Sequence, residues 1–349
     1  MNCFKLSKIH FRLYISKEII RKCNTLQNSA YKEHENSHES QSLVKVAVIG
    51  MPNAGKSTFI NYLMDRKVCP TSSKVHTTRT KASAIFTHGN TQIVFLDTPG
   101  LVNNNVRRRH NLENSFIKDS NISLQQCDLI SVIHDVSNSW TRNTLDIKIL
   151  RLLEQHQNKE SFLVLNKVDV LKSKRKLLDI VRLLTHNSLA GKPIGKNEEP
   201  LDIEKKGWPN FKDIFMVSAL TGTGLNELKQ YLIRAAKPGK WLYPEEMFTD
   251  QSPEKIIENT VKATLLDFLP QEIPYQMKPQ IELYEVNDGI INTVVIIKCV
   301  SDRVAKLVAG LGDGRLRQIT ESTQRNLQSV FQHFVRIRIV LESKEKKIN

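Results

Sequence analysis

A phosphate-binding pattern stands near the start of the chain, in residues 50–58. The order Gly-x-x-x-x-Gly-Lys-Ser follows directly on a short apolar run. Its two glycines let backbone N–H groups converge on phosphate oxygens, and the helix expected to begin near Lys56 adds a positive N-terminal end. Lys56 is expected to reach the outer phosphates, and the hydroxyl of Ser57 to bind Mg²⁺. The pattern predicts a nucleotide site that contains Gly50, Pro52, Asn53, Ala54, Gly55, Lys56, Ser57 and Thr58.

A second group of residues, Asp97-Thr98-Pro99-Gly100, also follows an apolar run. The carboxylate of Asp97 can hold Mg²⁺ through a water molecule, and the backbone amide of Gly100 can sense the outermost phosphate. This group predicts a site that distinguishes a nucleoside triphosphate from a diphosphate.

A third group, Asn166-Lys167-Val168-Asp169, provides a means of reading the base. The carboxylate of Asp169 can accept hydrogen bonds from both N1–H and the N2 amino group of guanine, a pair of donors that adenine lacks. Because a buried polar group left unpaired costs free energy, this contact discriminates between the two bases. Further along, the backbone of Ser218, Ala219 and Leu220 can approach O6 of guanine. The predicted ligands are GTP and GDP.

These four groups share one position, since each follows an expected β-strand. The strands are expected at residues 44–49, 92–96, 162–165 and 214–217. The first is β-branched and almost continuously apolar, which is typical of a strand buried on both faces of a parallel sheet. Open α/β sheets bind ligands at the carboxyl ends of their strands. The sequence therefore predicts an α/β fold with a doubly wound sheet that carries the nucleotide at one edge.

The length of 349 residues suggests two domains. After a helix expected at residues 225–236, residues 237–244 have the proline and glycine content of an interdomain linker. A smaller α+β module follows, with Phe331 and Phe334 expected in its core. Its helices are expected at residues 253–268, 304–309 and 316–334 and its strands at 280–285, 290–300 and 335–341. The predicted boundaries are 43–237 for the first domain, 238–252 for the linker and 253–345 for the second domain.

The first thirty residues interleave basic and apolar side chains and contain a single acidic residue, Glu18. This composition is typical of a mitochondrial transit peptide, and a basic disordered tail is the alternative. Residues 32–42 are polar throughout, as in a linker. No run of about 18 apolar residues occurs in the sequence, so no transmembrane segment is expected. We therefore expect residues 1–42 to be a transit peptide followed by a linker.

The chain carries a net charge of +15, from 51 basic and 36 acidic residues. Most of the excess lies in residues 43–242, which contain 30 basic and 17 acidic residues. Such a balance favours a polyanionic partner, either nucleic acid or an anionic membrane surface, although a solvated basic surface has the same composition. The five cysteines are scattered and lack C-x-x-C spacing, which argues against a disulfide framework and a zinc site and fits a reducing compartment.

The four groups resemble the G1, G3, G4 and G5 boxes of the translation-factor-like GTPases, and the C-terminal region resembles the type II KH domain of the Era family. The second resemblance rests on residues 253–256, Pro-Glu-Lys-Ile, and residues 269–275, Leu-Pro-Gln-Glu-Ile-Pro-Tyr. Residues 207–216 also resemble Era-like GTPases of animal mitochondria. The resemblance covers residues 44–341 and implies a P-loop GTPase domain that hydrolyses GTP with Mg²⁺, followed by a KH domain.

The resemblance further implies binding to small-subunit ribosomal RNA during assembly of the mitochondrial small ribosomal subunit, with GTP controlling the affinity for RNA. The expected location is the mitochondrial matrix, and a peripheral association with the inner membrane is left open. Two alternatives also stay open. One is a membrane-associated regulator that uses its basic face, and the other is a GTPase docking scaffold whose KH-like module has lost RNA binding.

The resemblance also bears on catalysis and on the metal. Ras-like enzymes have a glutamine after Asp-x-x-Gly that orients the attacking water, whereas this chain has Leu101. The chain resembles the GTPases in which an asparagine of the phosphate loop binds K⁺, and Asn53 stands at the matching position. The alternative is that Asn53 is a turn residue whose side chain only braces the loop. The catalytic residues expected are Lys56, Asn53 and Gly100, with hydrolysis faster in K⁺ than in Na⁺. The first switch is expected to contain Thr77 and Thr78, and the expected metal ligands are Ser57, Thr78 and Asp97.

One departure from the family pattern concerns RNA. KH domains clamp a nucleic-acid backbone with a G-x-x-G loop, but residues 310–314 here read Gly-Leu-Gly-Asp-Gly, with no two glycines three apart. If Leu316 and Ile319 set the register of the next helix, Asp313 stands at the second glycine position, and its carboxylate repels phosphate. The RNA-binding residues expected are Gly310, Gly312, Gly314, Arg315 and Arg317, of which the two arginines partly offset the charge of Asp313.

Overall fold

The computed structural model describes residues 41–69, 82–97, 121–194, 207–270 and 273–343. The chain divides into two units, Met1–Gln41 and Ser42–Asn349. The expected transit peptide, the first switch with Thr77 and Thr78, and residues 98–101 lie outside the described residues.

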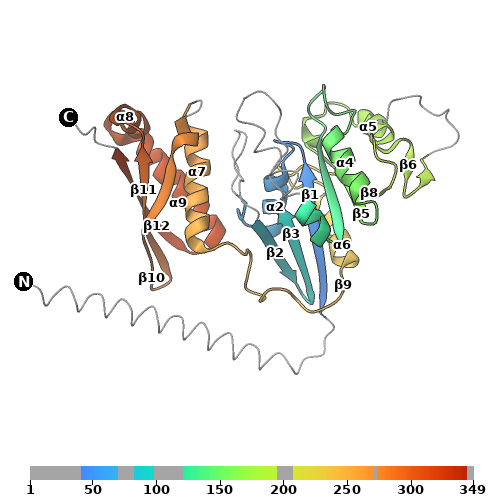
Figure 1. Ribbon diagram of the computed structural model, residues 1–349, viewed down its shortest axis with the longest axis horizontal. Helices are drawn as coiled ribbons and strands as arrows, with labels where there is room; N and C mark the ends of the chain where they lie inside the picture. Colours follow the sequence, from blue (N-terminus) through green and yellow to red (C-terminus); the bar gives the residue numbers. More distant parts are fainter. Residues whose placement is uncertain (1–40, 70–81, 98–120, 195–206, 271–272, 344–349) are drawn as a thin grey trace, which may run out of the picture. The chain divides into compact units, whose positions relative to one another are not determined.

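The first part of the unit from Ser42 onward is a sheet with helices on both faces (Figure 1). The strands lie in the order β2-β3-β1-β4-β5-β8, with β2 antiparallel to β3 and the other neighbours parallel. The sheet confirms the predicted α/β fold class. Its elements are β1 (Ser42–Gly50), α2 (Lys56–Met64), β2 (Ala82–His88), β3 (Thr91–Asp97), β4 (Leu129–Asp135), α4 (Ile147–Gln155), β5 (Glu160–Asn166), α5 (Arg175–Thr185), β8 (Phe211–Met216) and α6 (Leu225–Ala235).

The sheet separates two apolar cores, and alternate side chains of each central strand enter one or the other. On β1, Ala47 and Ile49 belong to the core that contains buried residues of α4 and α5. Val46 and Val48 belong to the core that contains buried residues of α2 and α6. A strand that lies between two helical layers must be apolar on both sides. This is why the run at residues 44–49 is nearly continuous rather than alternating.

The stretch predicted as a linker is bound to the sheet. Strand β9 (Lys237–Pro238) pairs antiparallel with the first residues of β1. The side chain of Gln92, on β3, is buried and accepts hydrogen bonds from the backbone N–H groups of Leu242 and Tyr243 at 3.0 and 3.1 Å. It also donates to the carbonyl of Tyr243 at 2.8 Å.

Residues 248–250 continue this contact along β2, the edge strand of the sheet. The N–H of Ile85 donates to the carbonyl of Phe248 at 2.9 Å. The hydroxyl of Thr249 donates to the carbonyl of Ser83 at 2.9 Å, and the N–H of Ser83 donates to the carboxylate of Asp250 at 2.8 Å. Edge strands expose unpaired backbone groups. The connecting segment pairs several of these groups on β2 and is therefore an ordered part of the fold.

Among its described residues, the C-terminal module contains three α-helices and a three-stranded sheet of order β10-β11-β12 (Figure 1, orange to red). Strand β10 is antiparallel to β11, and β12 is parallel to it. One core joins buried side chains of all three helices to one face of the sheet. In chain order the elements are α7 (Pro253–Phe268), β10 (Lys278–Asn287), β11 (Ile290–Cys299), α8 (Asp302–Ala309), α9 (Gly314–Phe331) and β12 (Phe334–Ser343).

The expectation that Phe334 lies in this core is wrong, since its side chain is 75% exposed. The helix α9 ends at Phe331, so helical spacing does not extend to Phe334, which is the first residue of β12. In that strand the side chains facing the core are Val335, Ile337 and Ile339. Phe331 is partly buried against the same core, as expected.

The described residues include three cysteines, Cys69, Cys127 and Cys299, all of them buried free thiols. Burial raises the pKa of Cys127 to about 11, so this thiol stays protonated and unreactive at neutral pH. In the same part of the chain, no group of three or more His, Cys, Asp and Glu residues could hold a metal ion. Nor does that part contain a helix long and apolar enough to cross a membrane.

Candidate nucleotide-binding site

The loop between β1 and α2 has the tight backbone that glycine permits. Asn53 and Gly55 lie in the left-handed region, with φ values of 60° and 97°. A Cβ atom on Gly50 would lie 2.5 Å from the carbonyl oxygen of Ile133, and one on Gly55 would overlap the side-chain nitrogen of Asn166. The two glycines of the pattern therefore let this loop lie directly against β4 and β5.

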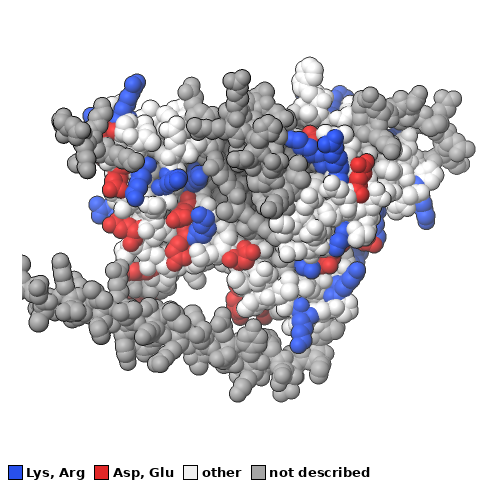
Figure 2. Space-filling view, viewed as in Figure 1, with Lys and Arg blue, Asp and Glu red and all other residues white. Residues whose placement is uncertain are grey.

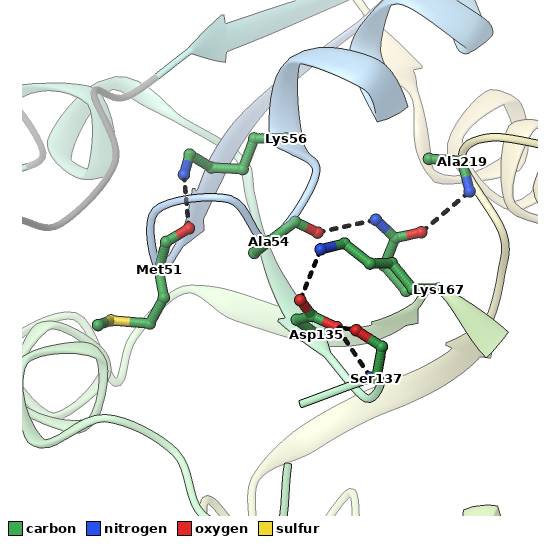
Figure 3. A network of polar contacts seen from close by, with 8 residues as sticks. Met51, Ala54, Lys56, Asp135, Ser137, Lys167 and Ala219 are labelled. Atoms are coloured by element: carbon green, nitrogen blue, oxygen red, sulfur yellow. Dashed lines mark hydrogen bonds and ion pairs between the residues drawn. The ribbon is translucent and has the colours of Figure 1, made fainter. Parts of the chain in front are cut away.

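Lys56 is the first residue of α2 and points back into the loop. Its side chain is only 8% exposed, and Nζ donates to the carbonyl of Gly50 at 3.0 Å and to that of Met51 at 3.1 Å, the second of which is drawn in Figure 3. No side chain caps the N-terminus of α2 at Gly55. The loop thus combines an ammonium group with an uncapped helix N-terminus, two features that favour phosphate.

The buried side chain of Asn166 connects the phosphate loop to the loop after β8. Its Nδ2 donates to the carbonyl of Ala54 at 2.8 Å, and its Oδ1 accepts from the N–H of Ala219 at 2.9 Å (Figure 3). Both polar atoms of the amide are therefore satisfied by backbone groups of other segments. The structure brings together the first, third and fourth groups of residues found in the sequence.

Lys167 makes an ion pair that was not predicted. Its backbone is left-handed, with φ 68°, and its Nζ lies 2.6 Å from Oδ2 of Asp135, the last residue of β4. The other carboxylate oxygen of Asp135 accepts from the N–H and the hydroxyl of Ser137, at 2.8 and 2.6 Å. Figure 3 shows the Lys167 side chain extended toward Asp135.

The carboxyl group of Asp135 is held in its ionised form. Burial raises its pKa, but the hydrogen bonds from Lys167 and Ser137 outweigh this effect, so the pKa lies below its ordinary value. The sequence contained one signal for this residue, because Asp135 ends an apolar run just as Asp97 and Asn166 do. Its partner could not be identified without the pairing of β4 with β5, in which Asp135 lies beside Asn166.

The residues expected to contact the base lie at the ends of β5 and β8. Asp169 is exposed, in the short 3₁₀ helix Val168–Val170 that Lys167 begins. The N–H of Val168 donates to the carbonyl of Val217 at 3.3 Å, so this helix lies beside the loop with Ser218, Ala219 and Leu220. Ser218 is buried and accepts a hydrogen bond from the N–H of Thr221. The Asp169 carboxylate is thus open to a ligand beside that loop.

The remaining expected residues of this site are only partly described. The backbone of Asp97 ends β3, where it is the register partner of Val48 on β1. Its side chain and Thr77, Thr78, Thr98, Pro99 and Gly100 lie outside the described residues.

The loop between α8 and α9 contains the residues expected to bind RNA. Gly310, Gly312 and Asp313 have positive φ values of 74°, 54° and 58°. Asp313 thus adopts a conformation that favours glycine, while Gly314 is an ordinary helical residue at the start of α9. The guanidinium of Arg315 donates to the carbonyl of Leu307 at 2.6 Å, whereas Arg317 is exposed. Arg315 therefore supports the end of α8, and its charge is only partly available to a ligand.

The sequence of this chain matches a family model and several known proteins. Residues 45–167 match the family model described as 50S ribosome-binding GTPase. A protein of Danio rerio named GTPase Era, mitochondrial, is 39% identical over 336 residues, which cover 86% of this chain and 75% of that protein. A protein of the same name from Salmo salar is 36% identical, covering 88% of this chain and 77% of that protein.

A solved structure shows the same fold over most of the chain. It is described as Era in complex with MgGDPNP and nucleotides 1506–1542 of 16S ribosomal RNA. The match has a TM-score of 0.69 at 22% identity and covers 88% of this chain and 95% of the other. The similarity therefore includes the C-terminal module as well as the larger sheet.

Proposed function

The chain belongs to the Era family of GTPases and hydrolyses GTP, and from this premise we propose that it binds small-subunit ribosomal RNA under GTP control and assists assembly of the mitochondrial small ribosomal subunit. One observation supports the nucleotide site most directly. The Asn166 side chain joins the phosphate loop at Ala54 to the loop at Ala219. Because one buried amide binds both loops, their positions relative to each other are fixed. A nucleotide whose phosphates bind the first loop can therefore place its base at the second.

Each loop has a separate task in this proposal. The backbone of the phosphate loop and the ammonium of Lys56 hold the phosphates. Asp169 accepts hydrogen bonds from guanine, and the backbone of Ser218, Ala219 and Leu220 lies against the base. The amide of Gly100 is proposed to sense the outermost phosphate, and Thr98 and Pro99 to belong to the same nucleotide site. Loss of that phosphate on hydrolysis would release the switch segments and change the affinity for RNA.

The residues of the phosphate loop fit Mg²⁺. The ion takes oxygen ligands and obtains most of them from nucleotide phosphates and water, so few protein ligands are needed. Ser57 is the second residue of α2. Asp97 is the last residue of β3, the strand that pairs with β1. These two residues and Thr78 are the proposed ligands. The ion would neutralise negative charge on the phosphates.

Asn53 is proposed to bind K⁺ and to replace the missing glutamine. It is exposed at the tip of the phosphate loop, in a left-handed conformation that asparagine tolerates. GTP hydrolysis by the full chain is expected to be faster in KCl than in NaCl, and Asn53→Ala is expected to remove the difference. Equal rates in the two salts would leave Asn53 as a residue that only braces the loop.

Three observations support RNA as the partner and mitochondria as the location. The basic excess lies in residues 43–242, and Lys and Arg predominate over the larger sheet on the face shown in Figure 2. The solved structure with the same fold contains ribosomal RNA. Two relatives, 39% and 36% identical, are named as mitochondrial, and the first thirty residues are basic and amphipathic.

A docking scaffold without RNA affinity is a second candidate, favoured by Asp313, whose carboxylate stands in the loop expected to approach phosphate. Crosslinking in cells followed by sequencing of the bound RNA distinguishes the two. The proposed function predicts one discrete site in small-subunit ribosomal RNA. Recovery of the protein without such a site would favour the scaffold, or a membrane regulator if the protein remains with membranes.

A further inference from the structure

The ion pair between Asp135 and Lys167 has no part in the roles described so far. We propose that Asp135 is a positioning residue, which fixes the side chain of Lys167 and thereby slows the release of bound guanine nucleotide. This inference rests on the proposed function, because it assumes that Asn166, Lys167 and Asp169 form the guanine site.

The geometry makes Asp135 a rigid anchor. One carboxylate oxygen is occupied by Lys167 at 2.6 Å, and the other accepts two hydrogen bonds from Ser137. The backbone around it is also held, since the N–H of Val136 donates to the carbonyl of Asn166 at 3.1 Å. A carboxylate bound on both oxygens cannot rotate freely, so the position of the Lys167 ammonium is set by β4.

Lys167 needs such an anchor, because a lysine side chain has many rotamers and loses entropy when it is held in one. Lys167 follows the last residue of β5 and begins the 3₁₀ helix that contains Asp169, so with its ammonium fixed at Asp135 its four-carbon stem connects the base site to the end of β4. An apolar stem of this kind can cover the flat face of a base while its charged end stays bound. Without the carboxylate the stem would move and expose the base to exchange with solvent.

The same pair contributes little to folding. The side chains of Lys167 and Asp135 are 34% and 21% exposed, and partly exposed ion pairs typically contribute little to stability. Removing the carboxylate charge should therefore change the rate of nucleotide release much more than it changes stability. This separates a positioning role from a structural one.

The test is the dissociation rate of a fluorescent N-methylanthraniloyl GDP from the full chain, measured by stopped flow with excess unlabelled GDP. Asp135→Asn keeps the shape of the side chain but removes its charge, and release is expected to become about tenfold faster. Ser137→Ala removes one of the two bonds to the other oxygen, and it should accelerate release about two- to threefold. Thermal stability of both variants should remain near that of the wild type.

A matched control lies at the opposite end of the same strand. Asp128 directly precedes β4, and its carboxylate accepts a hydrogen bond from the N–H of Lys45 at 2.8 Å. Asp128→Asn therefore removes a carboxylate that is partly buried, like that of Asp135, but lies just before β4, at the other end of the strand. Its rate of GDP release should equal that of the wild type.

A double-mutant comparison identifies the partner. Lys167→Ala should also accelerate release, and adding Asp135→Asn to it should cause no further acceleration, because the carboxylate then has no ammonium to hold. The ratio of GDP to IDP affinity should stay unchanged in Asp135→Asn, since Asp169 still reads the N2 amino group. A shift in that ratio would mean that the whole base loop had moved, and would contradict the inference.

Three further results would overturn the inference. They are a GDP release rate of Asp135→Asn equal to that of the wild type, an equal acceleration of release in Asp128→Asn, and additive effects of Lys167→Ala and Asp135→Asn on the release rate. A wild-type chain that binds no labelled GDP at all would instead contradict the proposed function on which this inference rests.

Discussion

The side-chain amide of Asn166 donates to the carbonyl of Ala54 at 2.8 Å, a contact between residues 112 positions apart in sequence. It links the end of β5 to the loop that follows β1, although β4 lies between these strands. The position of the phosphate loop relative to the base loop therefore depends on one side chain.

Asn166→Ala should disturb both loops at once. It leaves the N–H of Ala219 and the carbonyl of Ala54 without their partner, and a buried polar group left unpaired costs about 1–3 kcal/mol. We expect a loss of stability in this range and a loss of GDP binding, measured by denaturant unfolding and by titration. Asn166→Asp keeps an acceptor for Ala219 but sets a buried carboxylate oxygen against the carbonyl of Ala54, so its loss of stability should be at least as large. Wild-type GDP affinity in Asn166→Ala would contradict the linking role.

Gln92→Ala should loosen the segment that connects the sheet to the C-terminal module. The buried Gln92 side chain makes three hydrogen bonds to the backbone of Leu242 and Tyr243, so its removal should cost about 2–3 kcal/mol. Hydrogen exchange should become faster at residues 241–243 and stay slow in β5. As a control, Gln155→Ala on the exposed surface of α4 should change stability by less than about 0.5 kcal/mol. Unchanged exchange at residues 241–243 would contradict this prediction.

Asp313→Gly should stabilise the chain and strengthen RNA binding. Asp313 has a φ of 58°, a conformation whose steric cost for residues with a Cβ atom is roughly 1 kcal/mol and is absent for glycine. The substitution also removes a carboxylate from the loop expected to approach phosphate. Asp313→Asn separates the two effects, because it removes the charge but keeps a side chain. Affinity for a small-subunit ribosomal RNA fragment should rise in both variants, and no rise in either would favour the scaffold.

Stability should fall at mildly acidic pH because of His134. This histidine is buried on β4, its Nε2–H donates to the carbonyl of Arg142 at 2.9 Å, and burial lowers its pKa. The unfolded chain takes up a proton near the ordinary value of about 6.5, whereas the folded chain does so only at lower pH. The stability is therefore complete above about pH 6.5 and decreases as the pH falls below it, by up to about 1.4 kcal/mol per unit.

Denaturant unfolding at pH 7.5 and 5.5 measures this dependence. His134→Gln keeps a donor for Arg142 and should show a smaller difference between the two pH values than the wild type. His156→Gln serves as a comparison: burial and the charge of Lys159 also lower the pKa of His156, but this histidine is less deeply buried, so its effect should be smaller. An equal pH dependence in the wild type and in His134→Gln would assign the effect to other groups.

Local signals predicted much of this fold. The helix α7 has the predicted bounds, because Ser252 caps it by accepting from the N–H of Lys255 and Pro253 stands at its first position. The phosphate and base motifs were predictable because each places particular residue types at fixed spacing after an apolar strand. These signals need only a few neighbouring residues.

The interactions that were missed depend on distant pairings. The ion pair of Asp135 with Lys167 exists because β4 and β5 are neighbours in parallel register. Gln92 stands at the start of β3, just before an apolar run, and its partners lie about 150 residues further along the chain. Phe334 was misassigned because the end of α9 could not be located from apolar spacing alone. In each case, the missed feature depends on strand pairing or on a helix end that local residue spacing does not reveal.

The affinity of the purified full chain for GDP and for ADP tests the central claim most directly. Because Asp169 can pair with N1–H and the N2 amino group of guanine, we predict tight binding of GDP and little binding of ADP, and a change from GDP to XDP preference in Asp169→Asn. Equal or tighter binding of ADP, or no binding of either nucleotide, would contradict the assignment of this site.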